Sequence, residues 1–401
     1  MAHSSGSPGS SNTPRMAAEK GAGLPYAVLA CMLVFYWSIF SRALTYTLMP
    51  TVGAELRLSN SAAGLAIAVM LLGFSFGNWS SGWLPGSRRA RIVGGVALSL
   101  PGVVLLSQAA GTGTLMVGAG LMGLGVGFYL PLGLSLLVEA GGQRNRARFM
   151  AVHELAGTLG SFSGSTFVAV MLFWTDWRGT LLMAGLVGAA AVVAFARVRD
   201  SGGQAVKRGS RGRVPLDLRL VYSATIHASV SILLMGLISV LPLIMVRAWG
   251  LSQADAASVI GYTRLAGLLA VLMVGLKGDR WGHSRMLRMF QLLSLAGTSV
   301  MSLNGYGPLF LAGVLVLAVG AVGTVSLQPL IIAGAYPQDQ REQALASANS
   351  VGGLVGMVGA PALFGALMDL GLTTAPIVLS VATTLVAILV TGRIRPYREA
   401  S

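Results

Sequence analysis

The chain has 401 residues, of which 54% are hydrophobic and only 10% are charged. A soluble globular protein carries about 25% charged residues, so this composition excludes an ordinary water-facing surface. The net charge is +15, but the basic residues stand in short bursts between apolar runs. Nucleic acid binding would need them gathered on a folded polar domain, so we expect no nucleic acid partner. The single cysteine, Cys31, supports neither a disulfide framework nor a metal cluster.

Apolar runs long enough to cross a membrane follow one another along the chain. A helix needs roughly 17–25 apolar residues to span a bilayer, and about twelve segments meet this length. The runs are uniformly apolar and lack the alternation of β-barrel strands. We therefore expect an all-α membrane protein in which about twelve transmembrane helices form two pseudo-symmetric six-helix bundles. The expected spans are 25–49, 61–84, 91–109, 113–138, 150–173, 179–197, 220–246, 255–275, 288–304, 308–335, 345–368 and 375–392.

Polar stretches divide the chain into regions. Residues 1–23 are rich in Ser, Gly, Pro and Asn and predict a disordered tail. Residues 24–199 form the first expected bundle and 219–393 the second. Residues 200–218 are polar and basic and predict a linker, and 394–401 form a second tail.

The basic residues also predict orientation. Of the 28 Lys and Arg residues, 23 fall on the side that holds both tails and the linker, and the opposite side has only Arg57, Arg178 and Arg247. Because cytoplasmic loops carry the excess of Lys and Arg, both termini are expected in the cytoplasm. High Ala, Gly and Arg content is typical of a bacterial inner membrane protein. We expect a monomer in that bilayer.

The two halves repeat one another. A shift of 195 residues lays Arg146–Ala151 on Arg341–Ala346 and brings Gly157 onto Gly352. A nearby shift lays Pro131 on Pro329. Two parallel repeats with a site between them at mid-membrane form a transporter architecture.

Short motifs carry a resemblance to a known family. The segment after the eighth span reads Gly275-x-x-x-Asp279-Arg280-x-Gly282, and its first-half counterpart ends in Arg88-Arg89 but lacks the aspartate. Glu139 is followed by Arg146 after the fourth span, Asp176-Trp-Arg178 precedes the sixth, and Gly365-Ala-Leu-Met-Asp369 closes the eleventh. With the spans, the linker and the repeat, these motifs resemble the major facilitator superfamily. The resemblance implies a secondary transporter working by alternating access, with no enzymatic activity and no cofactor.

The resemblance places a gate in those loops. Asp279 could accept hydrogen bonds from the backbone amides of a neighbouring helix end or from Arg280, and Gly275 and Gly282 let the turn pass close to other backbones. The alternative is that these charges only set topology. The expected gating residues are Asp279, Arg280, Gly275, Gly282, Arg88, Arg89, Glu139 and Arg146.

Two arginines inside membrane spans are the main substrate candidates. Arg42 shares a face of the first span with Ser38 and Thr45, and Arg264 stands near the middle of the eighth with Tyr262 nearby. A charge at such depth costs about 2.5–3.5 kcal/mol on insertion scales, so it is expected to face a polar path. One arginine from each half could clamp a carboxylate. Snorkelling to the interface is the alternative for each, and an internal structural pairing is a further alternative for Arg264.

The eighth-span arginine is similar to that of the oxalate and monocarboxylate branches of the superfamily, whereas the second-span arginine of the nitrate branch has no counterpart here. This comparison favours an organic anion, most simply a carboxylate.

Other polar residues complete the predicted site. Tyr129, Gln328 and Asn349 could contact substrate or form hydrogen bonds between helices. Glu154, His153 and His227 are candidates for binding a coupling proton, and burial would raise the pKa of the Glu154 carboxyl group toward neutrality. A contact of Glu154 with nearby arginines, or a packing role for His227, is the alternative.

The sequence therefore predicts a secondary transporter of a small organic anion, driven by protons or by exchange. An exporter of amphipathic or cationic compounds is the alternative within the same class. Drug-exporting branches carry a proline in the fifth span, and the run Gly157–Gly164 lacks one. A non-transporting receptor or scaffold is the alternative of another class.

Overall fold

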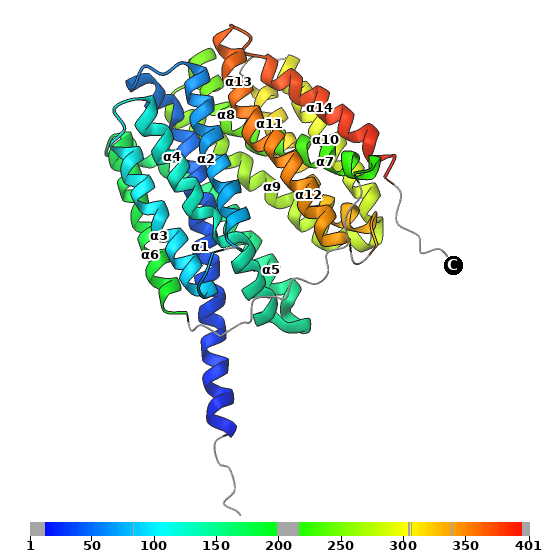
Figure 1. Ribbon diagram of the computed structural model, residues 1–401. Helices are drawn as coiled ribbons and strands as arrows, with labels where there is room; N and C mark the ends of the chain where they lie inside the picture. Colours follow the sequence, from blue (N-terminus) through cyan, green and yellow to red (C-terminus); the bar gives the residue numbers. More distant parts are fainter. Residues whose placement is uncertain are drawn as a thin grey trace, which may run out of the picture.

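The computed structural model describes residues 13–82, 84–198, 216–303, 305, 307–337 and 340–394, without the side chains of residues 13–25, 138–148, 150–152, 279 and 342. Described residues form helices and no strands, which confirms the predicted all-α class. Figure 1 shows the helices packed side by side. In chain order they are α1 Thr13–Glu55, α2 Asn60–Ser80, α3 Arg88–Ser107, α4 Thr112–Gly127, α5 Tyr129–Met171, α6 Trp177–Ala196, α7 Leu218–Ser231, η1 Ile232–Leu237, α8 Ile238–Leu243, η2 Ile244–Ala248, α9 Gln253–Trp281, α10 His283–Leu303, α11 Pro308–Gly334, α12 Arg341–Gly353, η3 Leu354–Gly359, α13 Ala360–Asp369 and α14 Ala375–Thr391.

Hydropathy identifies the membrane spans among these helices. Ten stretches of the described helices are long and apolar enough to cross a bilayer, and α14 is a shorter apolar helix. One of the ten, Thr112–Leu137, combines α4 with the first part of α5. The rest of α5 occupies the place of the fifth predicted span. This arrangement agrees with the predicted twelve-helix fold.

Helix ends differ from the sequence expectation at three places. α1 begins at Thr13, so residues 13–23 are helical rather than part of the tail. α5 continues through the segment expected to separate the fourth and fifth spans. α9 runs on to Trp281, so the motif from Gly275 is helical and only Gly282, with φ +78°, forms the turn. Hydropathy marks where lipid contact ends, whereas a helix without proline can continue into water.

Short polar side chains start several of the helices. The Ser59 hydroxyl accepts a hydrogen bond from the Ala62 amide at the start of α2, and Ser87 does the same for α3. Asp176, Asp217 and Ser252 cap α6, α7 and α9 in this way. Each cap satisfies an amide that the helix itself leaves without a partner. The loops between spans are therefore fixed by local sequence.

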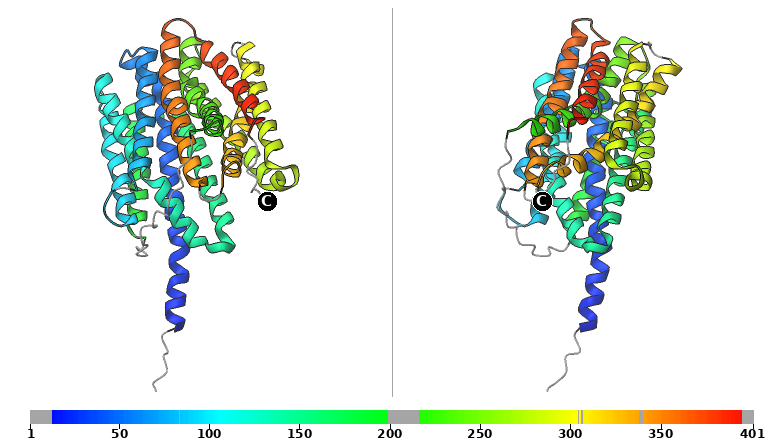
Figure 2. Two further views of the ribbon diagram at one scale, coloured as in Figure 1. Left: turned by 45° about the vertical axis from the view of Figure 1, so that its right-hand side comes forward. Right: turned by 90° about the vertical axis from the view of Figure 1, so that its right-hand side faces the viewer.

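The first half, α1–α6, packs against the second half, α7–α14, mainly through α2 on α13 and α5 on α9. Figures 1 and 2 show α2 and α13 side by side near the ends where α2 begins and α13 finishes. We call this the closed end, and we call the end where α6 finishes and α7 begins the linker end. Gly64 of α2 allows the approach, because a Cβ there would lie 2.3 Å from the Pro361 carbonyl oxygen of α13.

Two spans contain π-helical segments. The seventh span consists of α7, η1, α8 and η2, with Pro242 inside α8, and the eleventh consists of α12, η3 and α13. These wider turns shift side chains around the helix axis and often occur at functional sites. Gly356 of η3 lies against α7, where a Cβ would come within 2.6 Å of the Ala228 carbonyl oxygen. Both irregular spans belong to the second half.

Candidate functional site

Arg42 is held inside the first half by its own helix and by α2. Its side chain is only 5% exposed. The Nε group donates a hydrogen bond to the Ser38 carbonyl oxygen at 3.0 Å, and the guanidinium carbon lies 4.0 Å from the centre of the Phe74 ring. A cation over an aromatic face is stabilised by the ring quadrupole. These contacts keep Arg42 at depth within the protein instead of letting it snorkel to the interface.

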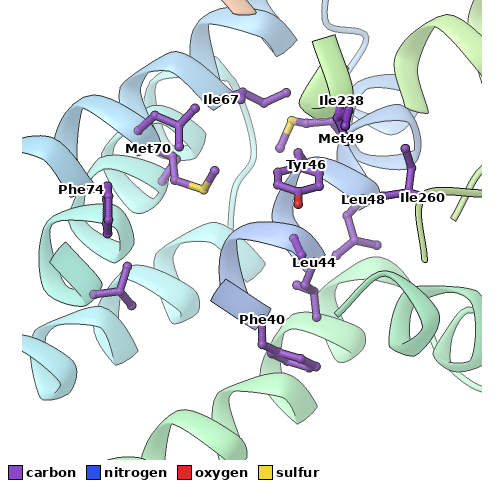
Figure 3. Close-up of a cluster of buried hydrophobic side chains, with 14 of the residues drawn as sticks. Phe40, Leu44, Tyr46, Leu48, Met49, Ile67, Met70, Phe74, Ile238 and Ile260 are labelled. Carbon is purple, nitrogen blue, oxygen red and sulfur yellow. The ribbon is translucent and has the colours of Figure 1, made fainter. Parts of the chain in front are cut away.

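Arg264 of α9 reaches across to the first half. Its Nη2 group donates a hydrogen bond to the Tyr46 hydroxyl of α1 at 2.8 Å. Tyr46 lies one helical turn after Arg42, so the two arginines approach the same short stretch of α1 from different halves. In Figure 3, Tyr46 stands among apolar side chains of α1 and beside Ile238 of α8 and Ile260 of α9. The phenol is thus part of the contact between the halves.

Neither arginine is neutralised by a described carboxylate. Among the ion pairs between described side chains, none includes Arg42 or Arg264. The Nε atom of Arg264 is buried and has no described hydrogen-bond partner. Buried charges are normally paired, and these two guanidinium groups have no described acidic partner.

The predicted neighbours of the arginines separate in the structure. Ser38 contributes its carbonyl oxygen to Arg42, while its hydroxyl bonds the Val126 carbonyl oxygen of α4 at 3.4 Å. Thr45 is buried and donates to the Ser41 carbonyl oxygen, so its hydroxyl is already used. Tyr262 is 63% exposed, and at two residues from Arg264 it points away from it around the helix. Of these three, only Ser38 contacts an arginine.

The remaining polar candidates form two separate clusters, one in each half. In the first half, His153 Nε2 lies 3.0 Å from the Tyr129 hydroxyl, and Glu154 follows His153 on α5. In the second half, the Gln328 amide bonds His227 Nδ1 and lies 3.5 Å from Asn349 Oδ1. The Tyr129 hydroxyl is held by His153 of the same helix, α5, and the Gln328 amide is held by His227 of α7 and Asn349 of α12.

Two of the predicted gating residues, Arg88 and Arg89, bond other helices of the first half. Arg88 bonds the Ser135 hydroxyl of α5 at 3.4 Å, and Arg89 bonds the Ala196 carbonyl oxygen of α6, so these bonds join helices of the first half. Gly275 and Arg280 are exposed on α9. The side chains of Asp279, Glu139 and Arg146 lie outside the described part of the structure.

A carboxylate contact at the closed end was not expected from the sequence. Asp369, the last residue of α13, accepts hydrogen bonds from the Asn60 and Ser61 amides of α2, both at 2.8 Å, and from the Ser61 hydroxyl at 2.5 Å. Asp369 therefore caps the first turn of a helix in the other half, where the helix dipole favours negative charge. The signal available was the aspartate at the end of the eleventh span, whose partner lies 308 residues away.

Arg247 adds a second contact at the same end. This residue of η2 donates to the Leu58 carbonyl oxygen at 3.1 Å and to Asn60 Oδ1 at 2.8 Å. In the sequence, Arg247 served only to predict the orientation of the chain in the membrane. Gly53 makes room for it, because a Cβ there would overlap the guanidinium group. The residues Asp369 and Arg247, with Asn60 and Ser61, form what we call the closed-end contact.

The sequence and the fold together identify the class of membrane transporter. The sequence model of the Major Facilitator Superfamily matches residues 30–233 and 223–401. The chain belongs to this superfamily, and it is a multi-pass membrane transporter and not an enzyme. Among curated proteins, it is similar to the 4-hydroxybenzoate transporter PcaK of Pseudomonas putida, with 24% identity covering 83% of this chain and 84% of that protein.

Solved structures share the fold. A bacterial homologue of the human lysosomal transporter Spinster, in an inward-facing and occupied conformation, has a TM-score of 0.78 at 14% identity and covers 94% of this chain and 99% of that one. The D-xylose-proton symporter gives 0.76 at 15% identity, over 93% and 97% of the two chains. The human organic anion transporter MFSD10 gives 0.65 at 14%, over 92% and 99%. At these identities the likeness concerns the fold alone.

Proposed function

We propose that the protein carries an organic carboxylate across the membrane and binds it between Arg42 and Arg264. The observation that carries this proposal is the pair of inward arginines, one from each half, without a described acidic partner. A carboxylate bound there would pair with both guanidinium groups and satisfy the buried Nε of Arg264. Planar guanidinium groups suit bidentate carboxylate binding.

The surroundings support an aromatic carboxylate. The Arg42 guanidinium already lies on the Phe74 ring, and the Arg264 guanidinium bonds the Tyr46 hydroxyl. Aromatic side chains provide apolar area for a ring beside the charged groups. The similar protein PcaK is a 4-hydroxybenzoate transporter. We therefore expect benzoate-like acids to be carried better than aliphatic acids of equal charge.

Alternating access follows from the same geometry. An anion between arginines of opposite halves draws these halves together, and its release lets them part. The contacts between halves described here gather toward the closed end, so the structure represents one side of that cycle. With the linker end in the cytoplasm, as the basic residues favour, this is a conformation closed to the outside.

Uptake into proteoliposomes tests the proposal. Wild-type protein is expected to take up radiolabelled 4-hydroxybenzoate, with unlabelled benzoate competing and lactate competing poorly. Arg42→Ala and Arg264→Ala should abolish uptake, while Arg285→Ala, at an exposed position of α10, should not. Uptake that survives both arginine changes would reject the arginine site.

The same preparation separates the alternatives. An exporter of amphipathic cations would bind a hydrophobic cation and lose that binding in Glu154→Gln but not in the arginine variants. A receptor or scaffold would give no uptake with any of these compounds.

A further inference from the structure

His153 is a buried imidazole fixed from two sides. Its side chain is fully buried, and its Nε2 atom lies 3.0 Å from the Tyr129 hydroxyl. The ring stacks on Phe35 of α1 with centroids 3.9 Å apart and planes at 14°. Because stacking and the hydrogen bond hold the ring in one orientation, the direction of its second nitrogen is fixed too.

That second nitrogen faces a carboxylate. His153 Nδ1 is buried and has no described hydrogen-bond partner, and the nearest charged atom described is Glu154 Oε1 at 3.6 Å. The Glu154 side chain is 57% exposed, so it connects the buried ring with the surroundings. In the neutral ring, Nδ1–H points toward the Glu154 carboxylate and Nε2 accepts the hydrogen of the Tyr129 hydroxyl. A further proton can then be held by the ring or by the Glu154 carboxyl group.

The described titratable groups around the ring are few. From α1 the Cys31 thiol approaches the Tyr129 phenol, and from α5 itself come Tyr129 and Glu154. The packing of α9 on α5 includes Gly261 against Thr166, more than three turns from His153. From α3, Arg88 bonds Ser135 on the first part of α5. In the described surroundings, Glu154 is therefore the carboxylate that can share a proton with His153.

The second half holds a neutral counterpart. The shift of 195 residues that relates the halves places Asn349 at the position of Glu154. Asn349 belongs to the cluster in which Gln328 bonds His227. An asparagine cannot take up a proton, so this cluster contains an imidazole without an adjacent carboxylate. The two halves therefore differ in whether a carboxylate lies beside the imidazole.

We propose that His153 and Glu154 form the binding site of a coupling proton, distinct from the arginine site. This proposal rests on the transport of a carboxylate proposed above. The proton enters through Glu154 and is held between the carboxylate and Nδ1, while Nε2 remains bonded to the Tyr129 hydroxyl. Protonation makes both ring nitrogens donors, so Nε2–H then donates to the Tyr129 oxygen and Nδ1–H to Glu154. The site gains one proton and loses one negative charge when it is loaded.

Two transport assays on the full chain separate proton coupling from substrate binding. Accumulation of 4-hydroxybenzoate driven by a pH gradient requires both, whereas exchange of labelled for unlabelled substrate without a gradient requires only substrate binding and movement of the halves. Glu154→Gln and His153→Gln should lose the gradient-driven accumulation and keep exchange. His227→Gln and Asn349→Asp are the matched changes in the second half, and His227→Gln should keep both activities. Gradient-driven accumulation at the wild-type level in Glu154→Gln would overturn the proposal.

A titration without substrate keeps the proposal testable if these variants fold poorly or if no compound is carried. The chain has four histidines, so ¹⁵N-histidine labelling in detergent gives few imidazole signals, and His153→Gln identifies the one sought. Its protonation midpoint should shift in Glu154→Gln and stay in Asn349→Ala. Absence of wild-type transport would reject the proposed function, whereas a His153 signal that ignores pH, or titrates identically in Glu154→Gln, would reject the proton site.

Discussion

Arg264 donates a hydrogen bond to Tyr46 across the boundary between the two halves, with 2.8 Å between Nη2 and the phenol oxygen. Each residue is otherwise anchored in its own half, so this bond links the two sides of the proposed anion site. It also explains how a guanidinium group without a described acidic partner stays ordered. A bound carboxylate would compete for the same donor or add to it.

Loss of the Tyr46 hydroxyl should weaken this link. In Tyr46→Phe the Arg264 donor loses its partner, and an unsatisfied buried donor costs about 1–3 kcal/mol. We expect a lower Tm and a raised KM for 4-hydroxybenzoate in proteoliposomes. Tyr36→Phe is the control, because that hydroxyl bonds Ser163 within the first half at 2.6 Å. An equal rise in KM in both variants would contradict a specific role for Tyr46.

Lysine should not replace arginine at position 42. Arg42→Lys keeps the charge but loses the planar group that lies on Phe74 and the Nε donor that bonds Ser38. Truncating one partner of a buried charge pair costs about 2–5 kcal/mol, and we expect Arg42→Lys to approach the loss in Arg42→Ala. The stabilisation that the ligand gives in a thermal shift assay measures this loss of binding. Stabilisation of Arg42→Lys to the wild-type extent would show that a positive charge alone is enough to bind the ligand.

The Asp369 carboxylate should control how often the closed end opens. Asp369→Asn removes the charge that faces the α2 amides, and hydrogen bonds to charged groups contribute about 1.5–3 kcal/mol each. We expect the population to shift toward the state open at this end. Spin labels in the loops at 56–59 and 370–374 would report a longer distance; Cys31 is buried, so labels would go to introduced cysteines.

Asp176→Asn provides the control for that experiment. Asp176 caps α6 from within the first half, so its loss should lower the Tm by weakening one helix start. The loop-to-loop distance should not change in this variant. Equal distances in wild type and Asp369→Asn would show that the aspartate does not hold the closed end.

Gly64 should be required for the close approach of α2 and α13. The added methyl group of Gly64→Ala would lie 2.3 Å from the Pro361 carbonyl oxygen, and such overpacking costs about 1–3 kcal/mol. We expect the same longer loop-to-loop distance and slower transport. Gly94→Ala on α3 meets nothing within 4 Å and should leave both unchanged. If Gly64→Ala behaves like the wild type, the close approach of α2 and α13 does not require glycine at this position.

The sequence alone determined the membrane class and the number of spans, because the free energy of placing a helix in lipid depends mainly on its own residues. It also singled out Arg42 and Arg264, since a charge within an apolar span is visible without any structure. The positions at which the helices begin and end were harder to predict from the sequence. The segment from Gly275 to Trp281 is helical, whereas the sequence suggested a loop after the eighth span.

Tertiary structure decided which polar residues meet. Ser38, Tyr129, Gln328 and Asn349 looked alike along the sequence, but packing assigns one to Arg42 and the others to two separate clusters. Contacts between the halves, such as Asp369 with Ser61, join residues some 308 positions apart. Their partners depend on helix crossing and rotation, which a local pattern does not encode. The two arginines could therefore be identified from the sequence, whereas the bond from Arg264 to Tyr46 could be found only in the fold.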